Sequence, residues 1–175
     1  MHALLQSLSL GNRRTIGESN RAASRVLDDP ALIGVLFEGV ASSDPVLRMR
    51  CADAIEKVTT SRPDLLVPFK KTILHRLSRV EQQEVRWHVA PMLARLPLTK
   101  TEETLVINLL LSYTNDRSSI VKTMSMQALA DIALRNHTLL PEIKRHLVEL
   151  SVIGTPAMKA RGKNLLKSLA RESNG

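Results

Sequence analysis

The chain has 175 residues, of which 43% are hydrophobic, 24% charged and only 2% aromatic, and its net charge is +8. This composition excludes an intrinsically disordered chain, and the length is sufficient for one domain with a substantial core. The positive charge is compatible with an acidic protein partner or with nucleic acid, but net charge bears on association and does not identify a fold.

The single cysteine, Cys51, excludes an intramolecular disulfide, which fits a reducing compartment. The first ten residues lack the basic segment of a signal peptide. No apolar run reaches the length of a membrane span. We therefore expect a cytoplasmic monomer that does not insert into membranes.

Residues 1–29 are expected to form an N-terminal cap. Leucines at four of the positions 4–10 predict a short helix that Gly11 ends. A longer helix is predicted over residues 15–27, and Pro30 follows its end. The inner face of this helix is expected to carry Ile16, Ala23 and Leu27.

Four helix pairs then repeat one apolar pattern. A basic residue recurs at steps of 38, 36 and 37 residues, and an apolar residue directly precedes each one. The chain is apolar again seven and ten residues after each basic residue and twelve residues before it, as expected for helices stacked on one another. The basic residues are Arg48, Arg86, Lys122 and Lys159, and the apolar positions are Leu47, Val85, Val121, Met158, Ile55, Leu93, Leu129, Leu166, Val58, Leu96, Ile132, Leu169, Leu36, Leu74, Leu110 and Leu147.

Each repeat is predicted to be a pair of helices, and no strand pattern with a period of two is present. The first helices are expected at residues 31–41, 65–77, 102–113 and 142–152, and the second helices at 45–59, 82–96, 119–134 and 156–170. We expect a single domain over residues 1–175, with the cap at 1–29 and repeats at 30–62, 63–98, 99–136 and 137–171. The alternative is a helical bundle in which this spacing is accidental.

The segment Asp44-Pro45-Val46-Leu47-Arg48, followed by Ala52 and Ala54, resembles the Asp-Pro-x-Val-Arg-x-x-Ala pattern of HEAT repeats. Residues 83–86 and 120–122 carry this resemblance more weakly, and it covers about residues 30–170. It implies an all-α, right-handed, armadillo-like α-solenoid. Through residues 12–17 and 85–88 the chain also resembles a group of small bacterial HEAT-repeat proteins, which implies no particular activity.

In HEAT-like solenoids the second helices line a concave surface that usually binds a partner. At 100° per residue, the helix face opposite the apolar stripe is centred on Met49 and Trp87 in the first two repeats. The accessible residues expected at or beside this face are Trp87, Arg50, His88 and Arg161. An exposed tryptophan flanked by arginines is typical of an interface hot spot. The alternative is that Pro91 disturbs the register locally and that Trp87 belongs to the core.

The four basic residues of the repeat are open to two interpretations. They form a ladder beside the apolar stripe, and in HEAT-like proteins such a ladder often connects one repeat to the next. Alternatively, the ladder contacts phosphates or carboxylates of a ligand. On the second interpretation, Arg86 and Lys122 are further candidate binding residues.

The sequence contains no Gly-rich phosphate loop, no His-Glu-x-x-His motif and no nucleophile elbow. Glu84 and His88 lie four residues apart, which predicts a surface pair and not a metal site. We therefore expect no catalytic residue, metal or cofactor. The preferred function is that of a scaffold, a non-enzymatic interaction module that binds a protein partner. An acidic partner would suit the positive charge of the chain.

Two other functions remain open at this stage. The net charge favours weak nucleic-acid binding, distantly like that of the HEAT-like DNA-alkylation-repair glycosylases. That family places an aspartate and tryptophans on its concave face, whereas here Trp87 is the only tryptophan and Pro91 follows it on the same face. The second alternative, by analogy of fold alone, is an accessory protein of the HEAT-like lyase kind.

Overall fold

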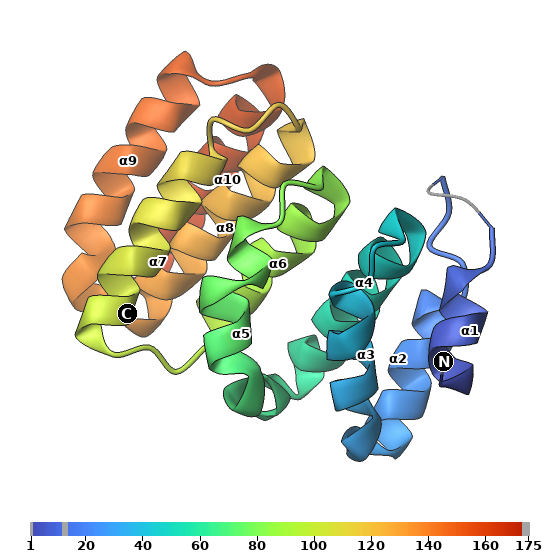
Figure 1. Cartoon of the computed structure of the whole chain (residues 1–175). Coiled ribbons are helices and arrows are strands. Elements are labelled where there is room, and N and C mark those ends of the chain that lie inside the picture. Colours follow the sequence, from blue (N-terminus) through green and yellow to red (C-terminus); the bar gives the residue numbers. More distant parts are fainter. Residues whose placement is uncertain (1, 12–13, 173–175) are drawn as a thin grey trace. The chain divides into compact units, whose positions relative to one another are not determined.

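The computed structural model describes residues 2–11 and 14–172. Helices, short 3-10 segments included, take up 82% of the described residues, and no strand occurs among them (Figure 1). The prediction of an all-α protein is therefore confirmed. The internal contacts divide the chain into a first unit, Met1–Met92, and a second unit, Leu93–Gly175.

The first unit is built around one long helix. Helix α4 packs against α1, α2 and α3, which precede it in the chain (Figure 1). The 3-10 segment η2 follows α4 and also contacts it. The elements are α1 (Ala3–Ser9), α2 (Ser19–Asp28), η1 (Pro30–Leu32), α3 (Ile33–Val40), α4 (Pro45–Ser61), η2 (Pro63–Phe69), α5 (Lys70–His75), η3 (Leu77–Arg79) and the greater part of α6 (Gln83–Arg95).

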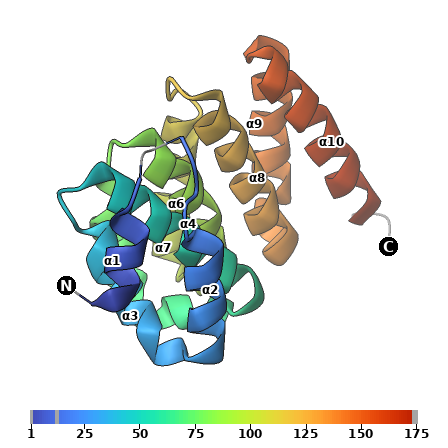
Figure 2. The ribbon, with the colours of Figure 1, turned by 90° about the vertical axis from the view of Figure 1, so that its right-hand side faces the viewer.

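The second unit consists of consecutive helices that pack on one another. Helix α8 contacts α7 and α9, and α10 packs on both α8 and α9 (Figure 2). Short connections favour this packing between sequence neighbours. After the last residues of α6, its elements are α7 (Lys100–Tyr113), α8 (Ser119–Arg135), η4 (His137–Leu139), α9 (Leu140–Ile153) and α10 (Pro156–Glu172).

Local signals explain where several helices begin. Oδ1 of Asp44 accepts from the backbone N–H of Val46 at 2.8 Å, and Pro45 opens α4, where its missing N–H is not needed. Thr99 and Glu102 form a reciprocal capping box at the start of α7. The start of α4 at Pro45 agrees with the helix expected over residues 45–59.

The apolar repeat describes the core correctly. Every apolar position of the repeat is buried except Leu166, which is half-buried. Within each unit, the predicted stripes therefore face the helices packed against them. Cys51, expected in the same stripe, is also fully buried.

Two predicted helices differ from the observed ones. The helix expected over 65–77 is a 3-10 segment followed by the short α5, because Pro68 lacks an N–H and disfavours α-helical geometry in the residue before it. The helix expected from residue 15 begins only at Ser19. Ile16 is exposed in the preceding turn instead of facing the core.

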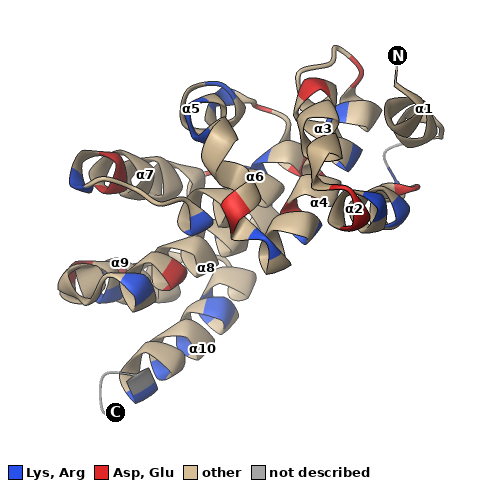
Figure 3. Cartoon of the chain, turned by 90° about the horizontal axis from the view of Figure 1, so that it is seen from below, with Lys and Arg blue, Asp and Glu red and all other residues tan. Residues whose placement is uncertain are grey.

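Charged residues are unevenly distributed over the helices. Lysine and arginine recur along α10 (Figure 3), where Lys159, Lys163 and Lys167 are all exposed. Separately, none of the helices in the described part of the chain combines the length and the hydropathy of a membrane span.

Candidate functional site

Arg50, in the middle of α4, has a buried guanidinium group. Its Nη1 donates to the carbonyl oxygen of Leu8 at 2.9 Å and to that of Leu10. Its Nε donates to the carbonyl of Thr15 and its Nη2 to the Thr15 hydroxyl, both at 3.4 Å. The residue is only 1% exposed. Arg50 therefore holds the end of α1, and Thr15 before α2, against α4.

The prediction that Arg50 is accessible to a partner is wrong. Helix geometry places Arg50 away from the apolar stripe, but Leu8, Leu10 and Thr15 cover that face of α4. Gly17 permits this close approach, because its φ of +52° is in the left-handed region and its missing Cβ would lie 2.5 Å from Cζ of Arg50.

Asp53, one turn after Arg50, is a second buried charge. Its Oδ2 accepts from Nζ of Lys57 at 2.6 Å, and the same ammonium donates to Oδ1 of Asn20 at 2.6 Å. Its Oδ1 lies 3.7 Å from Nε2 of His88. Asp53 therefore stands between a lysine of its own helix and a histidine of α6.

Asp53 was not among the predicted site residues. The available signal was a carboxylate between two alanines of an apolar helix, with Lys57 four residues later as an ion-pair partner. His88 was instead predicted to pair with Glu84 on the same helix. The carboxylate of Asp53, which lies 3.7 Å from the His88 ring, comes from α4, and a spacing rule within one helix does not detect it.

The surroundings of His88 favour the neutral form of its imidazole. Burial lowers the pKa of the ring, and the opposing effects of Asp53 and Glu56 are weaker; Lys57 lowers the pKa further. A neutral imidazole offers one N–H donor and one acceptor nitrogen. His88 can therefore take part in hydrogen bonds without adding a positive charge.

Trp87 lies beside His88 and is half-buried. Their rings meet edge to face, with centroids 5.8 Å apart and an angle of 70° between the planes. A cavity of about 200 Å³ adjoins them, and Met49, Ile16 and Arg14 also line it. Met49 and Trp87 were predicted at corresponding places in two successive repeats, and both line this cavity, although Met49 is buried.

The ladder arginines of the first unit have a structural role. Nε of Arg86 donates to the carbonyl of Val80, six residues earlier, at 2.9 Å. Nη1 of Arg48 donates at 2.9 Å to the carbonyl of Ser42, which is also six residues earlier. Both arginines therefore fasten the loop that precedes their own helix. Arg48 also makes the link between repeats that the first interpretation expects, because its Nε donates to Oε1 of Gln82 in the next repeat at 2.9 Å.

Lys122 and Arg161 belong to the second unit. Lys122 is half-buried on α8, and Arg161 is exposed on α10. Nη1 of Arg161 donates to Oε1 of Gln127 on α8 at 3.1 Å. The candidate site thus consists of Trp87, His88 and the buried Arg50, all in the first unit. Lys122 and Arg161 are not part of this site and stay separate candidates.

The cavity beside Trp87 is suited to recognition more than to covalent chemistry. Burial raises the pKa of the Cys51 thiol to about 12, so it is not a nucleophile at neutral pH. The hydroxyl of Ser19 is engaged with the carbonyls of Ile16 and Arg50. Within the described ranges, no three His, Cys, Asp or Glu side chains gather as metal ligands.

Comparison with known proteins gives no relative. Neither a family model nor a curated protein nor a solved structure matches the chain. The function is therefore inferred from the geometry of the described residues.

Proposed function

We propose that the chain is a HEAT-type helical-repeat protein that acts as a non-enzymatic interaction module and binds a protein partner at the cavity beside Trp87. The observation that carries this proposal is a half-buried indole, the only one in the chain, beside a cavity lined from three separate segments. Tryptophan is among the residues that most often dominate interfaces. The burial of the repeated apolar positions supports the HEAT-type assignment.

The cavity indicates the kind of partner group that it accepts. Met49, Ile16 and Trp87 provide an apolar lining, and Ile16 is 47% exposed. The carboxylate of Asp53 is already paired with Lys57, and the exposed Arg14 adds a positive charge to the lining. An apolar side chain next to an acidic residue complements these features.

Replacement of Trp87 tests the proposal. The Trp87→Ala variant should capture the partner from a lysate of the native organism at least tenfold less efficiently than the unchanged protein, because a central tryptophan contributes about 2 kcal/mol or more. Val152→Ala is a matched control, since it removes an exposed apolar side chain from the second unit. Equal capture by all three proteins would contradict the proposal.

Folding of the Trp87→Ala protein must be checked separately. A half-buried ring should contribute less than the roughly 3–5 kcal/mol that a core aromatic side chain does. Acrylamide should quench the fluorescence of the unchanged protein partly, and a bound partner should reduce this quenching. A fully shielded indole in the free protein would contradict an accessible site.

A second candidate function is nucleic-acid binding, and one observation favours it. The carboxylate of Asp53 lies in the same cavity as Trp87, a combination that resembles the aspartate and tryptophans of the alkylation-repair glycosylases. The exposed lysines of α10 provide a surface for phosphates. The ion pair with Lys57 and the 6% exposure of Asp53 argue against a base-directed role.

Two measurements separate the candidates. Fluorescence anisotropy with a labelled duplex should show only weak binding that falls steeply between 50 and 200 mM salt. Incubation with alkylated duplex should release no base. Release that the Asp53→Asn variant loses would replace the first candidate by the second.

A further inference from the structure

A larger cavity lies elsewhere in the first unit, between α3 and the segment formed by α5 and η3. Its volume is about 380 Å³, within the range of roughly 300–1,000 Å³ that is usual for small-molecule sites. It shares no lining residue with the cavity beside Trp87. The two cavities are therefore separate sites.

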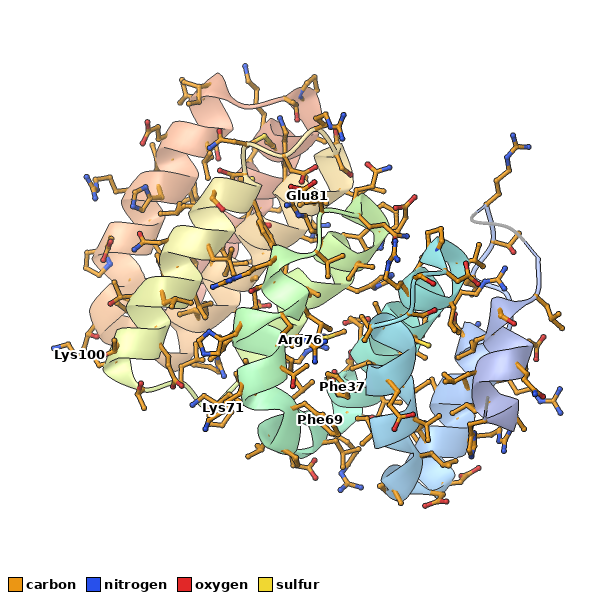
Figure 4. All side chains as sticks on the ribbon, viewed as in Figure 1. Phe37, Phe69, Lys71, Arg76, Glu81 and Lys100 are labelled. Carbon is orange, nitrogen blue, oxygen red and sulfur yellow. The ribbon has the colours of Figure 1, made fainter. Side chains whose placement is uncertain are left out.

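One side of this cavity is apolar and firmly packed. Phe37, Val40 and Leu77 line it, and all three are buried. The ring of Phe37 stacks on Phe69 with centroids 3.9 Å apart and an angle of 7° between planes. Figure 4 shows Phe37, Phe69 and Arg76 on the side of the first unit where α3 and α5 face each other. This wall suits an aliphatic chain.

The other side carries two guanidinium groups. Arg48 uses Nε and Nη1 for the amide of Gln82 and for the carbonyls of Ser42 and Ser43, each at 2.9 Å. Its Nη2 has no partner among the residues that the structure describes. The guanidinium of Arg76 is exposed and likewise has none within that part of the chain. Arg48 is thus held in place with one donor edge remaining.

The described lining of the cavity contains no carboxylate, while Thr72 adds a hydroxyl beside the two arginines. The field inside is therefore positive, and the polar groups are mainly donors. A cationic ligand is disfavoured by Coulomb repulsion, and a purely apolar one would leave both guanidinium groups without a counter-charge.

We propose that this cavity binds an aliphatic carboxylate, with its chain against Phe37, Val40 and Leu77 and its carboxylate paired with Arg76 and Nη2 of Arg48. The planar guanidinium matches a planar carboxylate, and the charge-assisted hydrogen bonds between them are the strong ones. The single negative charge of a carboxylate suits the two available donor groups, Nη2 of Arg48 and the guanidinium of Arg76. A phosphate fits them less well, because it brings up to two charges and three acceptor oxygens. The source is a free medium-chain acid or the C-terminus of a peptide that ends in an aliphatic residue.

The experiment titrates the full chain with octanoate and, as the neutral control, with octanamide, by isothermal titration calorimetry. We expect octanoate to bind with a dissociation constant of about 1 mM, which is reasonable for a ligand of this size. Octanamide should bind at least about tenfold more weakly, because it lacks the charge that makes the arginine hydrogen bonds strong.

Matched variants locate the site. Arg76→Gln should weaken octanoate binding about tenfold, whereas Arg79→Gln removes the same charge from an exposed residue outside the cavity and should leave it unchanged. In methyl NMR spectra, octanoate should shift the signals of Val40 and Leu77 and leave those of Leu129, in the second unit, in place. Equal effects of the two variants, or no methyl shift at Val40 and Leu77, would overturn the proposal.

A peptide arm identifies the source of the carboxylate. The tripeptide acetyl-Ala-Ala-Leu is compared with its C-terminal amide and with octanoate. If octanoate binds more tightly than the peptide, the site takes a free acid, and the opposite order assigns it to a protein C-terminus. Either result supports the proposal when it depends on Arg76, and the absence of binding by both carboxylates overturns it. Neither result affects the role of Trp87, which is measured with different variants.

Discussion

The two units bury different kinds of residues. The first contains Arg50 and Asp53, a buried cation and a buried carboxylate. In the described part of the second unit, the buried polar residues are Thr114 and Ser125, whose hydroxyls donate to carbonyls three and four residues earlier. A hydroxyl can be satisfied within its own helix, whereas a buried charge needs partners from other segments.

This difference shows where recognition can be built. The buried Arg50 bonds to Thr15, before α2, and the buried Asp53 lies beside His88 of α6. Both charged residues also line the cavity beside Trp87. The second unit relies on close apolar packing instead. At Gly162, for example, a Cβ would lie 1.8 Å from Oγ of Ser151 on the neighbouring helix. The candidate site therefore lies in the unit whose core contains buried charged residues.

The largest expected effect tests apolar packing in the second unit. Leu129→Ala should lower the free energy of unfolding by about 2–5 kcal/mol, because Leu129 is fully buried on α8 and its truncation leaves a cavity. Leu166→Ala, at the half-buried position of the repeat, should cost about 1 kcal/mol. Urea denaturation measures both. Similar losses for the two variants would show that the burial of the repeat positions does not determine their contribution.

The next effect tests the buried charge of the first unit. Arg50→Met keeps most of the side-chain length but removes the donors to Leu8, Leu10 and Thr15, and should cost about 3 kcal/mol. It should also speed thiol labelling of Cys51, the next residue of α4, under native conditions. Arg161→Met, at an exposed position, is the control and should change stability by less than about 0.5 kcal/mol. An unchanged labelling rate would contradict the role of Arg50 in holding the N-terminal segment.

A smaller effect distinguishes two glycines of the first unit. Gly17→Ala should destabilise by about 1–2 kcal/mol, because a side chain there is strained in the left-handed region and approaches Arg50. Gly34→Ala should be neutral or stabilise by up to about 1 kcal/mol, since Gly34 is inside α3 and the nearest atom to a Cβ would be 3.8 Å away. Thermal unfolding gives the sign of both changes, and the same sign for both would contradict the Gly17–Arg50 contact.

The smallest effect concerns pH. The unfolded His88 imidazole titrates near a pKa of about 6.5, and burial lowers the native pKa below this value. The unfolded chain therefore binds the proton more readily, so this contribution to stability is complete above about pH 6.5 and is lost as the pH falls through the native pKa.

The His88→Gln variant isolates this contribution. The free energy of unfolding of the unchanged protein minus that of the variant should be more positive at pH 7.5 than at pH 5.5. The other histidines are common to both proteins and cancel in the comparison. A difference that is independent of pH would show that His88 is not desolvated in the folded chain.

Much of the fold could be predicted because its causes are local. The apolar positions recur at helical spacing, so Leu47, Ile55 and Val58 indicate both α4 and its buried face before any packing is known. The cap formed by Asp44 and Pro45 also depends only on neighbours in the chain, and α4 begins at residue 45 as predicted. The exception, the split of the helix expected over 65–77, also has a local cause in Pro68, which the apolar period alone does not register.

The candidate site depended on contacts between residues far apart in the sequence. Periodicity places Arg50 and Trp87 on a particular face of their helices, but it cannot tell whether another segment covers that face. The carbonyls of Leu8 and Leu10 lie about forty positions before Arg50, and the link from Asp53 to His88 spans two helices. A buried charge is tolerated only where several such partners converge, and that convergence is a property of tertiary structure. The sequence by itself therefore determined the helices and their buried faces, and tertiary packing decided which polar residues form the site.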